Sequence, residues 1–218
     1  MSTVFRLDAS IRGKDSVTRG VADTLERAIL DNAGNTDVVR RDIAREPIDS
    51  SLWALTQSAP LVPDTESSNR RDEAVRVAHE LADEMLAADA YVIAAPFYNF
   101  GVSQHVKTWV DVLFGDPRFG PGEQPLAGRP SYVITARGGG YGPGTPREGW
   151  DHGTDWLRRI FGDVMGLDTQ VIETELTLAP ITPGMEELRD LAEANLRAAH
   201  ESARQVGKRL SGCLEAAA

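Results

Sequence analysis

Three short stretches of this 218-residue chain carry residue types that suit ligand binding. Residues 10–18 (S-I-R-G-K-D-S-V-T) combine hydroxyls with positive charge. Residues 96–101 (P-F-Y-N-F-G) put three aromatic rings in a turn, and residues 136–144 (A-R-G-G-G-Y-G-P-G) are rich in glycine. Hydroxyls and cations suit an anion, aromatic rings suit a flat ligand, and glycines let a ligand approach the backbone closely. Whether the three stretches act together depends on the elements that position them.

The first stretch runs into a helical pattern, so its hydroxyls lie where a helix begins. The side chains of Ser10, Ser16 and Thr18 can donate hydrogen bonds, and the backbone N–H groups at a helix N-terminus attract anions such as phosphate. Positive charge nearby comes from Arg12, Lys14 and Arg19. An equally good interpretation is that Ser16 only caps the helix. Neither G-x-x-x-x-G-K-[ST] nor G-x-G-x-x-G follows the strand, so a Walker loop and a dinucleotide fingerprint are excluded.

The aromatic stretch follows an apolar run at residues 89–95, which is typical of a strand buried on both faces of a parallel sheet. A plain turn gains little from Phe97, Tyr98 and Phe100 packed together. The stretch is therefore either a corner of the core or the wall of a pocket. The glycine stretch is in turn either a mobile surface loop or a backbone floor beneath a ligand, and Tyr141 within it is less expected of a plain linker.

Hydrophobic periodicity predicts strands and helices that alternate along the chain. The expected strands cover residues 3–9, 36–43, 89–95, 130–136 and 168–178. The expected helices cover residues 17–30, 68–88, 103–114, 155–166 and 183–210, with a short helix in the segment 46–68 and Ser103 as an N-cap. Strand–helix alternation predicts an α/β fold in which helices cover both faces of a five-stranded parallel sheet, as one domain over residues 1–218.

In an open α/β sheet, ligands bind beyond the carboxyl ends of the strands, where the strand order reverses. All three stretches follow predicted strands, so we expect them to meet at that edge. Together they supply an anion cradle, an aromatic wall and a glycine floor, which suits a phosphorylated planar ligand. FMN is the simplest candidate, since the flavodoxin-like strand order binds FMN at its switch point.

Composition excludes several other classes of function. The net charge of −10 and the pI of about 4.9 argue against nucleic acid and anionic membranes as partners. One cysteine and four histidines without ligand spacing predict no metal site, and the N-terminus lacks signal-peptide features. We therefore expect a cytoplasmic protein. A serine hydrolase would need G-x-S-x-G, and a cysteine phosphatase would need a cysteine in its first loop; neither is present.

Four motifs resemble one known family, the FMN-dependent NAD(P)H azoreductases and quinone reductases, which have a flavodoxin-like fold. They are L-D-A-S-I-R-G-K-D-S-V-T-R, A-P-F-Y-N-F-G-V-S-Q-H-V-K-T-W-V-D, V-I-T-A-R-G-G-G and W-L-R-R-I-F-G-D-V-M-G-L-D-T. The resemblance implies a flavodoxin-like three-layer sandwich and a homodimer. It also implies a ping-pong cycle in which FMN takes a hydride from NADH or NADPH and a quinone or azo compound then accepts it.

The same resemblance assigns residues to FMN by position in the motifs. Contacts to the phosphate fall on Ser10, Ser16, Val17 and Thr18. Contacts along the isoalloxazine fall on Pro96, Phe97, Tyr98, Asn99 and Phe100, and contacts at its pyrimidine end fall on Ala136, Arg137, Gly138 and Gly139. The chain departs from the family at Ala136, where a serine or threonine is common, and over residues 115–130 and 141–155. The last two segments flank the acceptor side of the pocket.

The flavin carries the difficult chemistry, so the protein needs no side-chain nucleophile. Backbone N–H groups of Gly138 and Gly139 can stabilise negative charge near the flavin N1 and O2. Tyr141 and His152 are candidates to position or protonate the aromatic acceptor, although the sequence favours a solvated loop histidine over a catalytic one at position 152. Two other functions stay open: a reductase dedicated to one aromatic metabolite of a pathway, and a flavin-binding sensor without catalysis.

Overall fold

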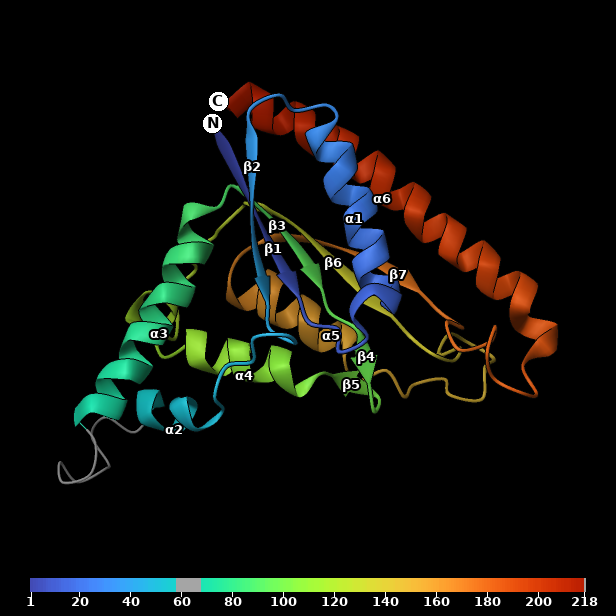
Figure 1. Cartoon of the computed structure of the whole chain (residues 1–218), viewed down its shortest axis with the longest axis horizontal. Coiled ribbons are helices and arrows are strands. Elements are labelled where there is room, and N and C mark those ends of the chain that lie inside the picture. The colour runs from blue at the N-terminus through green and yellow to red at the C-terminus, as the bar shows by residue number, and fades with distance from the viewer. Residues whose placement is uncertain (58–67, 218) are drawn as a thin grey trace.

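A five-stranded parallel sheet organises the chain. The computed structural model describes residues 1–57 and 68–217, and the strand order is β2-β1-β3-β6-β7 (Figure 1). The strands are β1 (Ser2–Asp8), β2 (Thr36–Asp42), β3 (Ala90–Ala94), β6 (Pro130–Ala136) and β7 (Asp168–Thr174). The chain passes from β1 to β2 on one side and then to β3 on the other. The switch point of the sheet therefore lies between the carboxyl ends of β1 and β3.

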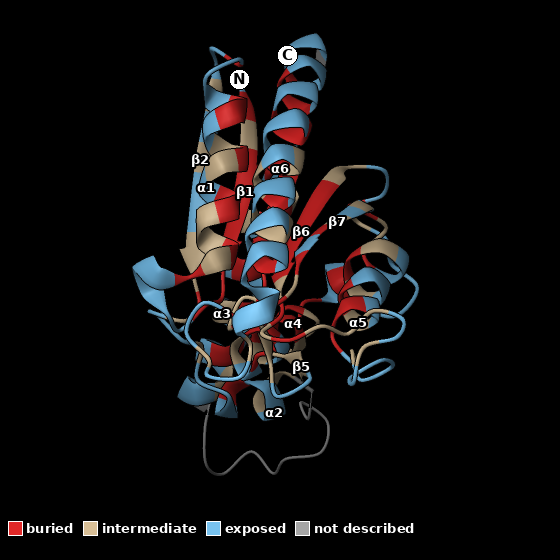
Figure 2. Ribbon diagram, turned by 90° about the vertical axis from the view of Figure 1, so that its right-hand side faces the viewer, coloured by how far each residue is buried: buried red, intermediate tan, exposed pale blue. Residues whose placement is uncertain are grey.

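Helices cover both faces of the sheet, which makes three layers (Figures 1 and 2). One face carries α1 (Val17–Leu30) and α6 (Arg189–Ala217), whose inward stripes are buried. The other face carries α2 (Ser51–Gln57), α3 (Ser68–Ala87), α4 (Gln104–Leu113), α5 (Thr154–Leu157) and the π-helical turn η3 (Arg158–Val164). The described elements also include a two-stranded hairpin, β4 (Phe97–Tyr98) and β5 (Gly101–Val102), and three single 3₁₀ turns: η1 (Gly13–Asp15), η2 (Pro117–Phe119) and η4 (Glu186–Leu188).

Alternating side chains of the central strands form the two cores. Tyr91 and Ile93 of β3 pack toward α3 and α4, whereas Val92 packs toward α1 and α6. Every residue of β3 is buried, because helices lie over both of its faces. On the α4 side, the rings of Trp109 and Phe5 stack with centroids 6.3 Å apart. This packing holds the carboxyl ends of β1 and β3 in place, and those ends carry the candidate site.

The predicted α/β fold and its five parallel strands are confirmed, with shifts at some element ends. The fifth strand ends at Thr174 rather than at residue 178, because Leu176 has a φ of 63° and turns the chain out of the sheet. The last helix begins at Arg189 and continues to Ala217. The short helix expected in the segment 46–68 is α2, and residues 58–67 of that segment lie outside the described part of the chain.

The segment 115–130 is held to α3 by a buried carboxylate. The side chain of Asp116 accepts hydrogen bonds from His79 Nδ1, the Arg118 side chain and the Arg118 backbone N–H. Burial opposes ionisation of Asp116, but these hydrogen bonds outweigh it and lower its pKa to about 2. Arg118 also pairs with Asp83 on α3. The loop is thereby tied to a helix of the core.

Asp116→Asn should destabilise the protein in a pH-dependent way. Since the pKa of Asp116 is depressed below its ordinary value of 3.8, its ionised form stabilises the fold above about pH 4. That contribution is lost as the pH falls toward 2. We expect the variant to unfold with roughly 2 kcal/mol less free energy at pH 7, and the gap to close between pH 4 and 2. Urea titrations across this range measure the gap. Asp163→Asn, an exposed surface-pair control, should show no comparable loss. A pH-independent gap for Asp116→Asn would contradict the assignment.

The crossing of α1 and α6 depends on one glycine. A Cβ at Gly207 would lie 2.6 Å from the Leu25 carbonyl oxygen and 2.7 Å from Ala28 Cβ. The backbone of α1 cannot move aside as the end of a flexible side chain can. The two helices can therefore approach this closely only if position 207 has no side chain.

Gly207→Ala should therefore destabilise the protein by about 1–3 kcal/mol through overpacking. Gly212→Ala is the matched control in the same helix, because a Cβ there meets nothing within 4 Å. The control should gain up to about 1 kcal/mol from helix propensity. Urea denaturation of both variants measures the difference, and equal stability of the two would refute the close crossing.

Candidate functional site

A cavity lies at the carboxyl edge of the sheet, where the loops after β1, β3 and β6 meet. Twelve described residues line it: Ser10, Arg12, Ser16, Val17, Thr18, Pro96, Phe97, Tyr98, Ala136, Gly138, Thr177 and Leu178. The three stretches that the sequence singled out thus share one cavity at the switch point. Its lining divides into a hydroxyl-rich end and an aromatic wall.

The hydroxyl-rich end is built around the first turn of α1. Ser16 caps this helix by accepting a hydrogen bond from the Arg19 backbone N–H, and its hydroxyl lies 3.1 Å from that of Thr18. Both side chains are buried, as is Ser10. The first turn leaves the backbone N–H groups of Val17 and Thr18 without acceptors inside the helix. Hydroxyls, free N–H groups and the positive end of the helix dipole converge here, which is an anion-binding arrangement. Ser16 thus caps the helix and also faces the cavity, so the two interpretations of its role are compatible.

The aromatic wall is a small hairpin that the sequence did not predict. Strands β4 (Phe97–Tyr98) and β5 (Gly101–Val102) pair antiparallel around Asn99 and Phe100. Both turn residues have positive φ, 48° and 68°, as in a type I′ turn. This conformation is easy for asparagine and costly for phenylalanine. The hairpin presents Phe97 and Tyr98 to the cavity, and the Tyr98 hydroxyl lies 3.2 Å from Ser10 Oγ.

The glycine stretch contributes Ala136 and Gly138 to the cavity. Gly138 lines it, and a Cβ there would lie 2.6 Å from Leu178 Cδ1 in the same lining. Gly139 is not among the described lining residues, and a Cβ there would meet the Arg147 guanidinium at 2.3 Å. Asn99, Phe100 and Arg137 also fall outside the described lining. Nine of the thirteen residues assigned to FMN by resemblance thus line one cavity, while these four lie around it.

The side chain of Arg137 points into an acidic cluster. Its guanidinium, 8% exposed, pairs with Asp151, with Glu173 at 2.6 Å and with Glu175 at 3.1 Å. Burial opposes ionisation of Asp151, but hydrogen bonds from Thr154 and other neighbours lower the pKa of that carboxyl. Arg137 thus clamps the glycine stretch to β7 and to the start of α5.

Residues 2–201 match the family model described as a flavodoxin-like fold. The FMN-dependent NADH:quinone oxidoreductase of Parafrankia sp. (strain EAN1pec) is 34% identical over 208 residues, which are 94% of this chain and 98% of that protein. The protein of the same name from Frankia casuarinae is 34% identical over 207 residues, with coverage of 94% and 98%. The chain belongs to this flavodoxin-like family.

Membership in the family confirms the resemblance inferred from the four sequence motifs. The azoreductase from Bacillus anthracis str. Sterne has the same fold, with a TM-score of 0.77 at 19% identity over 96% of this chain and 100% of that one. At that identity the likeness concerns the fold alone.

The sequence of this flavodoxin-like protein did not predict two residues that line the cavity, Thr177 and Leu178. The periodicity of residues 168–178 placed them inside the last strand, but the chain leaves β7 at Thr174 and turns back at Leu176. The Thr177 backbone N–H then donates to the Arg137 carbonyl, and that of Leu178 donates to the Gly138 carbonyl. No local pattern marks this return, because it depends on contacts between the loop after β6 and the loop after β7.

Beside the cavity, aromatic rings continue from Phe97 to the surface. The ring of Tyr141 lies 5.1 Å from that of Phe97, and Phe100 lies 5.5 Å from Trp150, which is half exposed. Tyr141 also contacts Phe100. His152 is exposed, and its backbone N–H donates to the Phe100 carbonyl. Tyr141 therefore adjoins the wall of the cavity, while the role of His152 toward an acceptor stays a prediction.

Over residues 1–57 and 68–217, no helix is long and apolar enough to cross a membrane. The same residues contain no group of three or more His, Cys, Asp or Glu side chains arranged to hold a metal ion.

Proposed function

We propose that this protein is an FMN-dependent NADH:quinone oxidoreductase that reduces quinones, azo compounds or both. The observation that carries the proposal is the cavity at the switch point, where an anion-binding helix start and an aromatic wall face each other. The names of its relatives point to the same activity. We further propose that the chain forms one domain over residues 1–218, that two copies form a homodimer, and that it acts in the cytoplasm.

The residues of the cavity suit FMN at both ends of that molecule. Ser10, Ser16 and Thr18, with the N–H groups of Val17 and Thr18, would hold the phosphate. Phe97 and Tyr98 would lie along the ring system, with Gly138 and Leu178 on its other border. When bound, FMN supplies the redox chemistry by accepting a hydride from NADH or NADPH and passing one to the acceptor in a separate half-reaction, which is a ping-pong cycle.

The protein's own residues would bind the flavin, orient the acceptor and shield both from water. Phe97 and Tyr98 would exclude water from the aromatic side of the cavity, and the backbone N–H groups of Gly138 and Gly139 would stabilise negative charge that develops nearby. Tyr141, which touches Phe97, would position a flat acceptor by its ring edge. Asn99, Phe100 and Arg137 would act from around the cavity, and His152 would reach an acceptor from the exposed loop.

Turnover separates the proposed reductase from a flavin-binding sensor. The purified chain should hold FMN, lose its visible flavin absorbance when NADH is added without oxygen, and regain it when a quinone is added. Stopped-flow absorbance with NADH, NADPH, and a panel of quinones, azo dyes and nitroaromatics measures both halves. A protein that holds FMN but stays oxidised with both nicotinamides over minutes would be a sensor. A reductase that accepts one aromatic compound alone would be dedicated to a pathway.

Ser16→Ala tests the anion end of the cavity. The variant should lose about 1 kcal/mol of stability with the helix cap, and FMN should bind roughly tenfold more weakly because the hydroxyl is gone. The control is Ser103→Ala, since Ser103 caps α4 by accepting from Val106 N–H at 3.2 Å and lies outside the described lining. The control should lose the same stability and keep its affinity for FMN. Thermal unfolding and fluorescence titration measure the two effects. Equal FMN affinity in the two variants would remove Ser16 from the site.

A further inference from the structure

Neighbouring strands β1 and β2 bring like charges side by side. Their parallel register places Arg6 beside Arg40 and Asp8 beside Asp42, on the sheet face that α1 covers. Arg6 and Asp8 are both buried. Like charges on adjacent strands repel, and burial strengthens the repulsion because little water screens it. Arg6 and Asp8 offset part of this repulsion by pairing with each other on β1 at 3.1 Å. Further charges of opposite sign come from another element.

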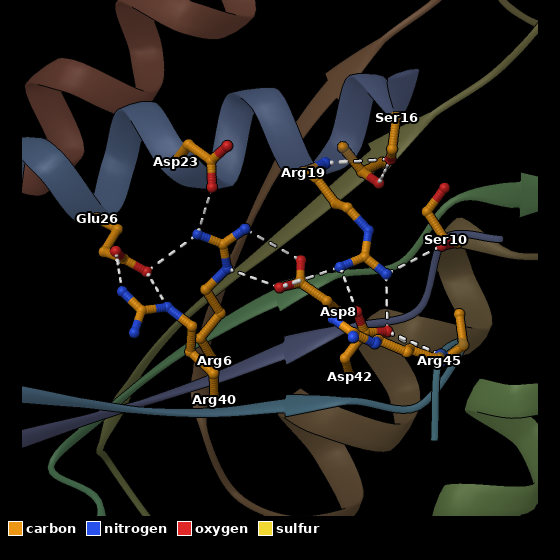
Figure 3. Close-up of polar contacts among 12 residues, drawn as sticks. Arg6, Asp8, Ser10, Ser16, Arg19, Asp23, Glu26, Arg40, Asp42 and Arg45 are labelled. Carbon is orange, nitrogen blue, oxygen red and sulfur yellow. Dashed lines mark hydrogen bonds and ion pairs between the residues drawn. The ribbon is translucent and has the colours of Figure 1, made fainter. Parts of the chain in front are cut away.

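Helix α1 supplies those charges from one face (Figure 3). Glu26 accepts hydrogen bonds from Arg6 and from Arg40, each at 3.0 Å. Arg19, two turns earlier, donates to both carboxylate oxygens of Asp42 at 2.7 Å and lies 3.6 Å from Asp8. Each pair of like charges therefore meets its opposite on α1.

Arg19 also contacts both ends of the loop that leads into α1. Its Nη2 donates to the Ser10 carbonyl oxygen at 3.0 Å, and its backbone N–H donates to Ser16 Oγ at 3.3 Å. The Ser10 carbonyl faces Arg19 (Figure 3). The Ser10 hydroxyl lies 3.2 Å from that of Tyr98, and Ser10 lines the cavity. Arg19 itself lies outside the described lining of that cavity.

Asp42 is a fixed anchor for Arg19. Its Oδ1 accepts from the backbone N–H groups of Ala44 and Arg45 at 3.2 and 3.0 Å. Burial opposes ionisation of Asp42, but the hydrogen bonds from Arg19 and from those backbone groups lower its pKa. The carboxylate is thus charged at neutral pH and rigidly held. Its bidentate contact with a planar guanidinium fixes the direction of that guanidinium as well as its distance.

We propose that Arg19, anchored by Asp42, is a positioning residue for the phosphate end of the flavin site. Its guanidinium acts from behind the loop, through the Ser10 carbonyl, and touches no flavin atom. The inference rests on the proposed FMN-binding function. A residue that only stabilised the fold would support all parts of the cavity equally. A positioning residue for the phosphate loop acts on the phosphate alone.

The comparison of FMN with riboflavin isolates that difference, since riboflavin has the same ring and lacks the phosphate. The full-length chain, freed of flavin, is titrated with each compound and followed by fluorescence quenching. For Arg19→Gln we expect the dissociation constant of FMN to rise about tenfold, which is 1.4 kcal/mol, while that of riboflavin stays within about twofold. Arg19→Lys keeps the charge but loses the bidentate geometry, so the rise should be about threefold.

Arg41→Gln is the matched control. Arg41 lies on β2, is 20% exposed against 16% for Arg19, and pairs with Glu80 and Glu84 on α3. Its loss removes an equivalent ion-pair cluster and should leave the FMN-to-riboflavin affinity ratio unchanged. Should Arg19→Gln fail to fold, Asp42→Asn is the second variant. It retains the arginine at position 19, removes its ion-pair partner and should raise the dissociation constant of FMN but not that of riboflavin.

The outcomes separate the two proposals. If the Arg19 and Asp42 variants lose affinity for FMN and for riboflavin equally, or lose neither, the positioning role is overturned. The proposal that the wild-type protein binds FMN would still stand. A similar change of ratio in Arg41→Gln would overturn the positioning role too. A wild-type chain that binds neither compound would instead overturn the proposed function, on which the inference rests.

Discussion

The register of β1 against β2 is the constraint on which the ligand-binding edge depends. It sets two arginines side by side and two aspartates side by side on a partly buried face, where the Arg6–Asp8 ion pair on β1 and opposite charges from α1 offset the repulsion. Helix α1 contributes opposite charges to both pairs through Arg19 and Glu26, which lie seven residues apart on one face. These contacts tie α1, whose first turn lines the hydroxyl-rich end of the cavity, to the edge of the sheet.

The apolar cores alone would locate α1 less sharply. Hydrophobic contacts are non-directional, and a helix can slide or turn over an aliphatic surface at modest cost. Directed, charge-assisted hydrogen bonds add the missing specification. The two kinds of contact lie on different sides of α1. Val21 and Leu25 are buried in the apolar core, while Arg19 and Glu26 make directed ion pairs with the strands. The same contacts hold the loop that precedes α1, because Arg19 also donates to the Ser10 carbonyl.

The border of the cavity formed by the glycine stretch is held by different interactions. There the glycine stretch is held by backbone hydrogen bonds from the loop after β7 and by the ion pairs of Arg137 with three carboxylates. The aromatic hairpin closes the site between these borders, with Phe100 held at positive φ and packed on Tyr141 and Trp150. Backbone strain at a ligand wall is consistent with a functional role for that conformation.

Much of this architecture is determined locally and could be predicted from the sequence. Apolar runs such as residues 89–95 specify buried strands, and strands alternating with amphipathic helices leave few topologies besides a covered parallel sheet. The same logic located the three loops, because loops after parallel strands share an edge. Serine at position 16 carries its capping role in its own chemistry.

Tertiary structure alone decided the rest, since it depends on partners far apart in the chain. Arg137 reads in sequence as part of a ligand loop, yet acids from two other segments draw its guanidinium away from the cavity. Thr177 and Leu178 read as strand, yet the backbone returns them to β6 and into the cavity wall. Arg19 reads as one more cation near a phosphate loop. Its partners Asp8 and Asp42 become neighbours only when two strands pair in register, and no spacing within the sequence encodes that meeting.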